Sequence, residues 1–355
     1  RTERRVHKVL SDAAEKLRGD DEFFSVLPSS VRIFAKTRQN GQTLRGAPLE
    51  VRSARDYLLN NFSLDPCRHK ASENKIRASA KAESSKNRKN TETVISVREA
   101  WFRYEKDSKD ILCGMNFDVH AGELTCIVGG NGAGKTTALL TAAGVFSPYR
   151  GKVKYRGKPI STFRKDKGSA GKIGVLVQNP LCCFVMDSVA EELEATAKAY
   201  KLPRSGIEEV IDIMQLQSVL GSNPYDISGG ELQRAAIAKL LLPEPEVIFL
   251  DEATKGMDAF FKAEFGALLR RLAARGTAIV LVSHDIEFCA EFADRCAMFF
   301  NGTVIAEGTP QDVFLGNSFY TTSACRISRG IIPDALTSEQ IIDYANRCER
   351  KKNDA

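Results

Sequence analysis

The sequence lacks three features that would each indicate a different class of protein: a long apolar run, a Cys-x-x-Cys pair and a widespread excess of one charge. Its longest apolar runs, around residues 279–282 and 247–250, have the length of a strand, whereas a membrane-spanning helix needs about 20 apolar residues. We therefore expect that this chain does not span a membrane by itself. Its nine cysteines are odd in number and follow no signal peptide, which favours reduced thiols in a cytosolic compartment.

Positive charge is concentrated in one segment. The net charge is +6, but residues 68–92 hold eight Lys/Arg and three Glu and account for +5 of it. The rest of the chain is nearly neutral, which argues against a general nucleic-acid-binding protein. Residues 65–92 contain almost no large apolar side chains, so we predict a flexible basic linker there. A contact of this linker with nucleic acid or anionic lipid is the alternative.

Beyond the linker, short apolar runs alternate with helical stretches. This alternation is typical of an α/β domain with a largely parallel central sheet. The predicted strands are residues 94–102, 124–128, 173–177, 247–250, 279–282 and 297–300.

A short pattern occurs twice in the chain. Residues 49–57 and 336–344 share Leu, Asp and Tyr at the same spacing, and each copy follows a segment that contains proline. The second copy ends the α/β domain, whereas no such domain precedes the first. We interpret residues 1–64 as the tail of a missing upstream copy of the domain. Chance similarity between two short helices is the alternative.

A glycine-rich loop follows the predicted strand 124–128 and matches the pattern G-x-x-x-x-G-K-[ST]. Glycines let backbone N–H groups turn toward phosphate oxygens, and the next helix presents its positive end. The lysine of this pattern reaches the β- and γ-phosphates of ATP, and the hydroxyl after it ligates Mg²⁺. The predicted nucleotide-binding residues are Gly129, Gly130, Asn131, Gly132, Ala133, Gly134, Lys135, Thr136 and Thr137.

Two carboxylates end the apolar strand 247–250. Ligands bind at strand ends of this kind in α/β sheets. Asp251 is placed to hold Mg²⁺, directly or through water, and Glu252 to polarise an attacking water as general base. An Asp-Glu pair alone is usually a solvated strand end, but its occurrence with a phosphate loop favours the catalytic interpretation.

A third motif, Ser-Gly-Gly-Glu-Leu-Gln-Arg, begins at Ser228, which can cap a helix. Gln178 follows the predicted strand 173–177, and His284 follows the predicted strand 279–282. With these residues in this order, the chain resembles the ATP-binding cassette (ABC) ATPases over roughly residues 93–310. The resemblance implies a P-loop NTPase fold with a mixed or parallel central sheet, an antiparallel β subdomain and a helical subdomain that carries the Ser-Gly-Gly motif.

The resemblance also implies a nucleotide-sandwich dimer that hydrolyses ATP. ATP and Mg²⁺ held by one domain are covered by Ser228, Gly229 and Gly230 of a second ABC ATPase domain. By the same resemblance, Gln178 senses the metal and the attacking water, and His284 contacts the γ-phosphate.

The same resemblance implies roles for two further residues. Asp258 matches the loop that crosses the dimer interface, and Tyr104 matches the aromatic residue that stacks on adenine. A surface tyrosine at the end of a strand is the alternative for Tyr104.

Residues 254–262, 283–289 and 316–322 are most similar to the ATPases of energy-coupling factor (ECF) transporters. These systems import vitamins or transition-metal ions such as cobalt and nickel. They pair two ATPase domains, on the cytoplasmic face of the cell membrane, with a transmembrane coupling subunit and a substrate-binding membrane subunit. Some members fuse both ATPase domains, and residues 48–52 resemble the tail of the first domain in such fusions. The expected division is a domain tail (1–64), the linker (65–92), the ABC ATPase domain (93–310) and a C-terminal helical tail (311–355).

The sequence departs from this pattern at two places. Ala253 stands where the family usually has proline, which removes no catalytic group. After Gln178, many ECF ATPases carry an acidic residue and a glutamine that meet the coupling subunit, whereas residues 181–184 here are Leu-Cys-Cys-Phe. The docking contact is either apolar or moved to Asp187 or Glu191.

Two alternative functions fit the same motifs. One is a soluble ABC ATPase that acts on ribosomes or nucleic acid, although only the linker is strongly basic. The other is an inactive regulatory cassette, against which the intact Glu252 and His284 argue.

Overall fold

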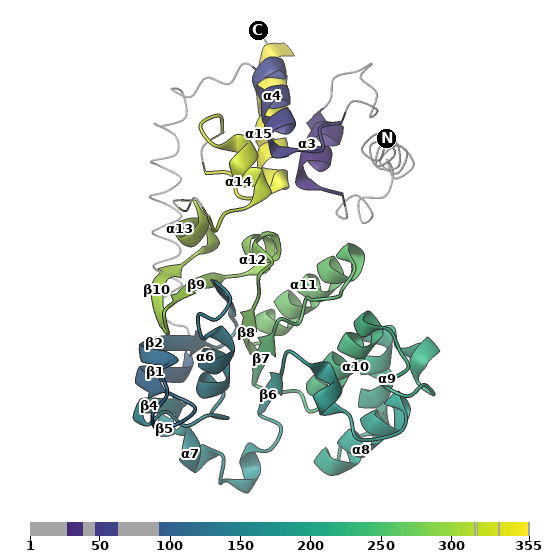
Figure 1. Cartoon of the computed structure of the whole chain (residues 1–355). Coiled ribbons are helices and arrows are strands. Elements are labelled where there is room, and N and C mark those ends of the chain that lie inside the picture. Colours follow the sequence, from purple (N-terminus) through teal and green to yellow (C-terminus); the bar gives the residue numbers. More distant parts are fainter. Residues whose placement is uncertain are drawn as a thin grey trace.

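The computed structural model describes residues 27–37, 47–62, 92–315, 317, 319–332 and 334–353. Figure 1 shows an α/β domain that carries a cluster of helices formed by both ends of the described chain. The predicted linker 65–92 lies outside the described residues except for Glu92. None of the helices within the described residues is long and apolar enough to cross a membrane.

A six-stranded sheet forms the centre of the α/β domain, with the strand order β10-β9-β3-β8-β7-β6. All neighbours are parallel except β10 and β9, as the alternation of strands and helices predicts. Strands β3, β7 and β8 are buried along their whole length, so helices and the second sheet cover both faces. The strands are β3 (Leu124–Gly129), β6 (Ile173–Leu176), β7 (Val247–Asp251), β8 (Ala278–Val282), β9 (Arg295–Phe300) and β10 (Thr303–Gly308).

A smaller antiparallel sheet, with the order β2-β1-β4-β5, packs on one side of the central sheet. Its core is shared with α6 (Lys135–Ala142), the helix that follows the glycine-rich loop. The strands are β1 (Thr93–Phe102), β2 (Leu112–His120), β4 (Arg150–Tyr155) and β5 (Lys158–Pro159), followed by the short helix α7 (Ile160–Phe163). This sheet is the antiparallel β subdomain that the family resemblance implies.

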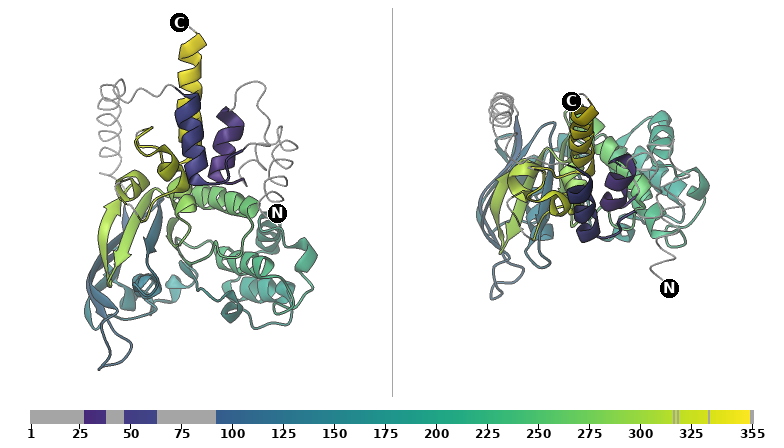
Figure 2. Two further views of the ribbon diagram at one scale, coloured as in Figure 1. Left: turned by 45° about the horizontal axis from the view of Figure 1, so that its top comes forward. Right: turned by 90° about the horizontal axis from the view of Figure 1, so that it is seen from above.

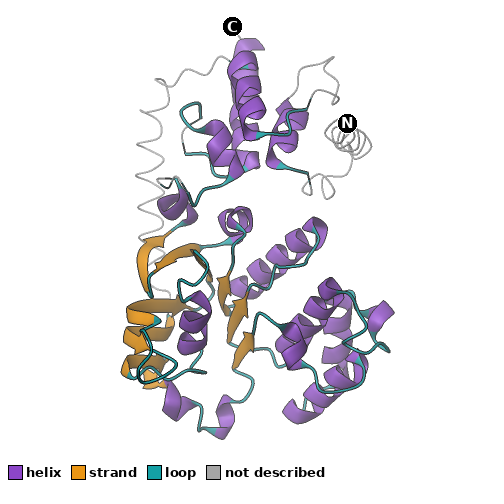
Figure 3. Cartoon of the chain, in the orientation of Figure 1, coloured by secondary structure: helices purple, strands orange, loops and turns teal. Residues whose placement is uncertain are grey.

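The remaining helices of the α/β domain divide into two groups. A helical arm is formed by α8 (Val189–Tyr200), α9 (Arg204–Ile213) and α10 (Gly229–Leu241), of which α10 packs against β6 (Figure 3). Nearer the central sheet lie α11 (Ala259–Ala274), α12 (Ile286–Phe292) and α13 (Pro310–Phe314). One-turn 3₁₀ helices occupy Lys167–Ser169, Pro180–Cys183 and Gln217–Val219.

Four helices from the two ends of the chain form a separate small core, which we call the tail cluster. They are α3 (Ser29–Thr37), α4 (Val51–Asn61), α14 (Ser323–Ser328) and α15 (Ser338–Asn353). Helix α3 packs against α15, and α4 packs against α14 (Figure 2). Ile33, Leu58, Ile327 and Ile341 are fully buried in this core. The two ends of the chain are therefore held together by apolar packing.

Two neighbouring leucines of α4 test this packing. Leu58 is fully buried, whereas Leu59 is 52% exposed. Leu58→Ala should destabilise the tail cluster by about 2–5 kcal/mol, because it leaves a cavity in the core. Leu59→Ala should change stability by less than about 0.5 kcal/mol. Hydrogen exchange of the α14 amides should become faster only in Leu58→Ala, and equal exchange in both variants would show that α4 does not support α14.

Candidate active site

The glycine-rich loop connects β3 to α6 in a conformation that only glycine adopts easily. Gly129, Gly132 and Gly134 have φ angles of 156°, 74° and 99°. A Cβ at Gly129 would lie 2.3 Å from the carbonyl oxygen of Phe299, and one at Gly134 would lie 2.9 Å from that of Ile111. Such a loop at the start of a helix presents backbone N–H groups to a phosphate.

Lys135 fills the centre of this loop. Its Nζ atom donates hydrogen bonds to the carbonyl oxygens of Gly129 at 3.0 Å and Gly130 at 2.8 Å. Burial lowers the pKa of Lys135, and the negative charges of Glu252 and Asp251 partly offset this effect. The ammonium group is therefore held where the phosphates of a nucleotide enter the loop.

Asp251 ends β7 as a buried carboxylate. Its residue is 2% exposed, and neither carboxylate oxygen has a hydrogen-bond partner. Burial raises the pKa of Asp251, as does the charge of Glu252, whereas the hydroxyl of Thr136 and the charge of Lys135 act in the opposite direction. Mg²⁺ prefers oxygen ligands, so an unpartnered carboxylate beside a threonine hydroxyl fits a magnesium site.

Glu252 lies between two of the other predicted catalytic side chains, Gln178 and His284. Gln178 Nε2 donates to its Oε2 at 3.2 Å, and His284 Nε2 lies 3.2 Å from its Oε1. The backbone of Glu252 has a left-handed φ of 52°, and its N–H donates to the carbonyl oxygen of Val282 at 2.9 Å. The ends of β6, β7 and β8 thus bring together Gln178 and Glu252, which are predicted to act on the attacking water, and His284, which is predicted to contact the γ-phosphate.

Tyr104 stands at the mouth of the same site. Its ring is exposed and meets the rings of Phe102 and Phe146 edge-on, at 5.2 and 5.7 Å between centroids. Its hydroxyl hydrogen-bonds the Thr137 hydroxyl at 3.0 Å, which ties it to the first turn of α6. An exposed ring supported by two other rings can stack on a base.

The Ser-Gly-Gly motif lies at the start of α10, in the helical arm. The Ser228 hydroxyl accepts a hydrogen bond from the Glu231 N–H at 3.3 Å, and the Glu231 carboxylate accepts one from the Ser228 N–H at 2.9 Å. Figure 1 shows α10 and α6 on opposite sides of the central strands. Asp258 is exposed and caps α11 by accepting from the Phe261 N–H at 2.8 Å. Within one chain, therefore, neither Ser228–Gly230 nor Asp258 is among the residues gathered around Lys135.

Two side-chain contacts around the site are not predicted from the sequence, although their residues lie in the ECF-like segments 254–262, 283–289 and 316–322. The Tyr320 hydroxyl approaches the phosphate loop, 3.5 Å from the position of a Cβ at Gly130. Lys262 forms an ion pair at 2.8 Å with Asp285, which follows His284 and caps α12. The capping position of Asp285 is visible in the sequence, but its partner is not, because α11 and α12 meet only in the folded chain.

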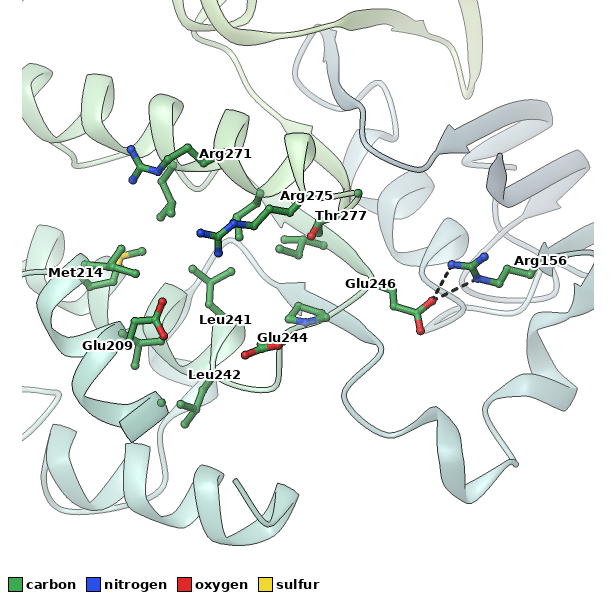
Figure 4. A pocket seen from close by; sticks show the side chains of 18 residues that line it. Arg156, Glu209, Met214, Leu241, Leu242, Glu244, Glu246, Arg271, Arg275 and Thr277 are labelled. Atoms are coloured by element: carbon green, nitrogen blue, oxygen red, sulfur yellow. Dashed lines mark hydrogen bonds and ion pairs between the residues drawn. The ribbon is translucent and has the colours of Figure 1, made fainter. Parts of the chain in front are cut away.

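A cavity of about 530 Å³ lies at the other end of the central sheet. Glu246 and Thr277, which immediately precede β7 and β8, line it, and Figure 4 shows Arg271 of α11 and Arg275, the C-cap of that helix, beside it. An ion pair of 3.0 Å between Arg156 and Glu246 lies at its edge. Since the residues described above lie at the carboxyl ends of the same strands, this cavity is not part of the nucleotide site.

The fold and this site define a P-loop ATPase. The family described as "ABC transporter" matches residues 112–255. A putative ABC transporter ATP-binding protein of Bacillus thuringiensis subsp. konkukian is 35% identical over 325 residues, which are 91% of this chain and 55% of that protein. The energy-coupling factor transporter ATP-binding protein EcfA of Methanocaldococcus jannaschii is 33% identical over 226 residues, which are 62% of this chain and 81% of that protein.

Solved structures agree with these relatives. The structure of cbiO1 from Clostridium perfringens, described as part of the ABC transporter complex cbiONQ, superposes with a TM-score of 0.56 at 30% identity. It covers 62% of this chain and 90% of that one. The chain therefore belongs to the ABC transporter ATPases, close to their energy-coupling factor type. It spans about half the length of the first curated relatives that it matches.

Replacement of Asp251 by asparagine should raise the stability of the domain at neutral pH. Because burial raises the pKa of this carboxyl, its contribution to stability is lost as the pH rises through the folded-state pKa. At pH 7, without nucleotide or metal, Asp251→Asn should therefore be more stable than the wild type by about 1–3 kcal/mol. The gain should shrink toward pH 4. Urea unfolding measures this, with the exposed Asp107→Asn as control. A destabilised Asp251→Asn protein would contradict the assignment.

Replacement of Tyr104 should affect nucleotide affinity through the ring. Base–aromatic stacking contributes about 1–3 kcal/mol, so Tyr104→Ala should weaken ATP binding by roughly 5–150-fold. Tyr104→Phe, which keeps the ring and loses the hydrogen bond to Thr137, should stay within about threefold of the wild type. Equilibrium titration with a fluorescent ATP analogue distinguishes them, and equal losses in both variants would assign the contribution to the hydroxyl instead.

Proposed function

We propose that this chain supplies ATP hydrolysis to an ECF-type importer of a micronutrient, a vitamin or a transition-metal ion such as cobalt or nickel. The observation that carries the hydrolytic part is the position of Glu252, which contacts both Gln178 and His284 beside the unpartnered Asp251. The likeness to EcfA and to a cbiONQ component supports the transporter type. The nature of the cargo rests on the family resemblance.

The mechanism follows from these contacts. Lys135 binds the β- and γ-phosphates in place of its two loop carbonyls, and Thr136 and Asp251 hold Mg²⁺. When bound, the metal neutralises charge on the phosphates. Glu252 accepts a proton from the attacking water, and its hydrogen bond from Gln178 orients the carboxylate. His284 donates to the γ-phosphate, and Tyr104 stacks on the adenine.

A second ABC domain completes the site. Ser228, Gly229 and Gly230 expose the start of α10 on the arm away from α6, where it suits the γ-phosphate of a nucleotide held by a partner domain. Asp258 projects at the start of α11, where it suits the same interface. A dimeric bacterial ABC transporter cassette is among the similar structures, with a TM-score of 0.54 at 25% identity, which supports this arrangement.

The tail cluster is evidence for a second domain linked to this one. The two copies of the Leu-Asp-Tyr pattern begin α4 and α15, and each follows a shorter helix. The Ser30 hydroxyl donates to the Leu49 carbonyl at 3.3 Å, and the Thr322 hydroxyl donates to the Leu336 carbonyl at 2.6 Å. The shorter helix of each pair packs against the longer helix of the other pair, α3 on α15 and α14 on α4, as expected for two copies of one helix pair. We propose that residues 1–64, of which the structure describes 27–37 and 47–62, are the tail of an upstream ABC domain.

The membrane partners would dock beside Gln178. Val185 and Met186 are 80% and 41% exposed, so the segment after Gln178 offers an apolar contact. Asp187 and Glu191 are exposed as well. We propose the apolar form because two adjacent apolar side chains are exposed to water in this segment. The partners are a transmembrane coupling subunit and a substrate-binding membrane subunit, and this chain would lie peripherally on the cytoplasmic face of the membrane.

Glu252→Gln tests the catalytic role. The amide cannot accept the proton of the attacking water, so hydrolysis should slow by roughly 10²–10⁴-fold. ATP binding should remain, because the phosphate loop is unchanged, whereas Lys135→Ala should weaken binding and turnover together. Single-turnover hydrolysis and ATP titration measure the two effects. A wild-type rate in Glu252→Gln would show that another group acts as the base.

The Glu252→Gln protein also tests the transporter assignment. It would be tagged and purified from gently solubilised membranes with ATP and Mg²⁺, and the proteins that accompany it would be identified. Small multispanning membrane proteins together with a second ABC domain are the expected result. Ribosomal proteins or nucleic acid without a membrane protein would instead favour a soluble ABC ATPase.

A further inference from the structure

The loop Cys183–Met186, which we call the docking loop, is held by an ion pair between the buried Glu192 and the half-buried Lys239. Glu192 of α8 is 2% exposed, and its Oε2 accepts hydrogen bonds from the N–H groups of Val185 at 2.8 Å and Met186 at 2.9 Å. Its Oε1 accepts from Nζ of Lys239, which also donates to the Cys183 carbonyl oxygen. One carboxylate and one ammonium group thus bind three backbone groups of the loop, those of Cys183, Val185 and Met186.

These contacts join three functional elements. Lys239 belongs to α10, whose first turn carries the Ser-Gly-Gly motif. Toward the other end of the loop, the Asn179 side chain accepts from the Leu181 N–H at 3.2 Å and fixes the 3₁₀ turn directly after Gln178. Gln178 in turn donates to Glu252. A continuous set of hydrogen bonds and short backbone connections therefore links the exposed Val185 and Met186 to the general base and to α10.

A charged residue, Glu192, occupies a buried position where an apolar residue would usually be found. Burial by itself raises the pKa of Glu192, yet its net pKa is lowered, because Lys239 and the two backbone N–H groups hydrogen-bond the charged form. Buried ion pairs of this kind often add little stability compared with apolar side chains of similar volume, whereas they fix geometry strongly. The neighbouring Glu194 on the same helix is exposed and serves as a comparison.

We propose that Glu192, with Lys239, is a positioning pair that couples the docking loop to α10 and to Gln178. This inference rests on the proposed function, because it assigns the docking loop to the membrane coupling subunit. The pair holds Val185 and Met186 outward for an apolar surface of that subunit. A force on these two side chains then reaches the Ser-Gly-Gly motif through Lys239 and Glu252 through Gln178.

The test replaces both charges together, so that neither is left buried alone. Glu192→Leu/Lys239→Met should unfold at the same denaturant concentration as the wild type and bind ATP within twofold of it. Hydrogen exchange in residues 183–187 should become at least tenfold faster. The amount of membrane subunit that accompanies the tagged chain from solubilised membranes should fall at least tenfold. Lys239→Arg, which keeps the ion pair, and Glu194→Gln should behave as the wild type.

Two outcomes would overturn the proposal: unchanged exchange in residues 183–187, or wild-type recovery of the membrane subunit by the double variant. If the wild-type chain itself recovers no membrane protein, the proposed function fails. The exchange of the docking loop in the isolated chain then still decides whether Glu192 and Lys239 position it.

Discussion

The parallel alignment of β3, β8, β7 and β6 determines where every reactive side chain of this protein lies. Leu176 pairs with Leu250, Leu250 with Leu281, and Ile127 with Val282, so the four strands end in one row. The hydrogen bonding of the sheet continues past the strands, because the Glu252 N–H bonds to Val282 and the Ser283 N–H bonds to Ile127. The phosphate loop, the carboxylate pair, the glutamine and the histidine are therefore positioned by backbone pairing.

This edge of the sheet carries a buried ammonium group and a buried carboxylate, which differ in the number of their hydrogen-bond partners. Lys135 is buried but has two carbonyl partners, whereas Asp251 is buried and has none. In the proposed mechanism, a magnesium nucleotide would supply phosphate oxygens to the ammonium group and a cation to the carboxylate. Part of the binding energy would then offset the electrostatic penalty of burying these two groups.

The sequence contains enough information to predict the sheet and the phosphate site, since local patterns specify them. The glycines at 129, 132 and 134 and the apolar runs before Asp251 and Ser283 each indicate their own conformation. Residues that act across the fold leave no such local pattern. Glu192 and Lys239 are 47 positions apart, and the predicted linker separates α4 from the α/β domain. A glutamate on an amphipathic helix is normally solvated, and only the packing of α8 against α10 makes it a buried anchor.

The backbone of Glu252 lies in the left-handed region. The residue that best suits this conformation therefore differs from the residue that we propose for catalysis. A residue with a side chain costs of order 1–3 kcal/mol in a sparsely populated φ,ψ region, and glycine avoids most of that cost. Glycine at position 252 would therefore be more stable, but it would remove the carboxylate that we propose as the general base. Stability and the proposed hydrolysis therefore place opposite demands on this one position.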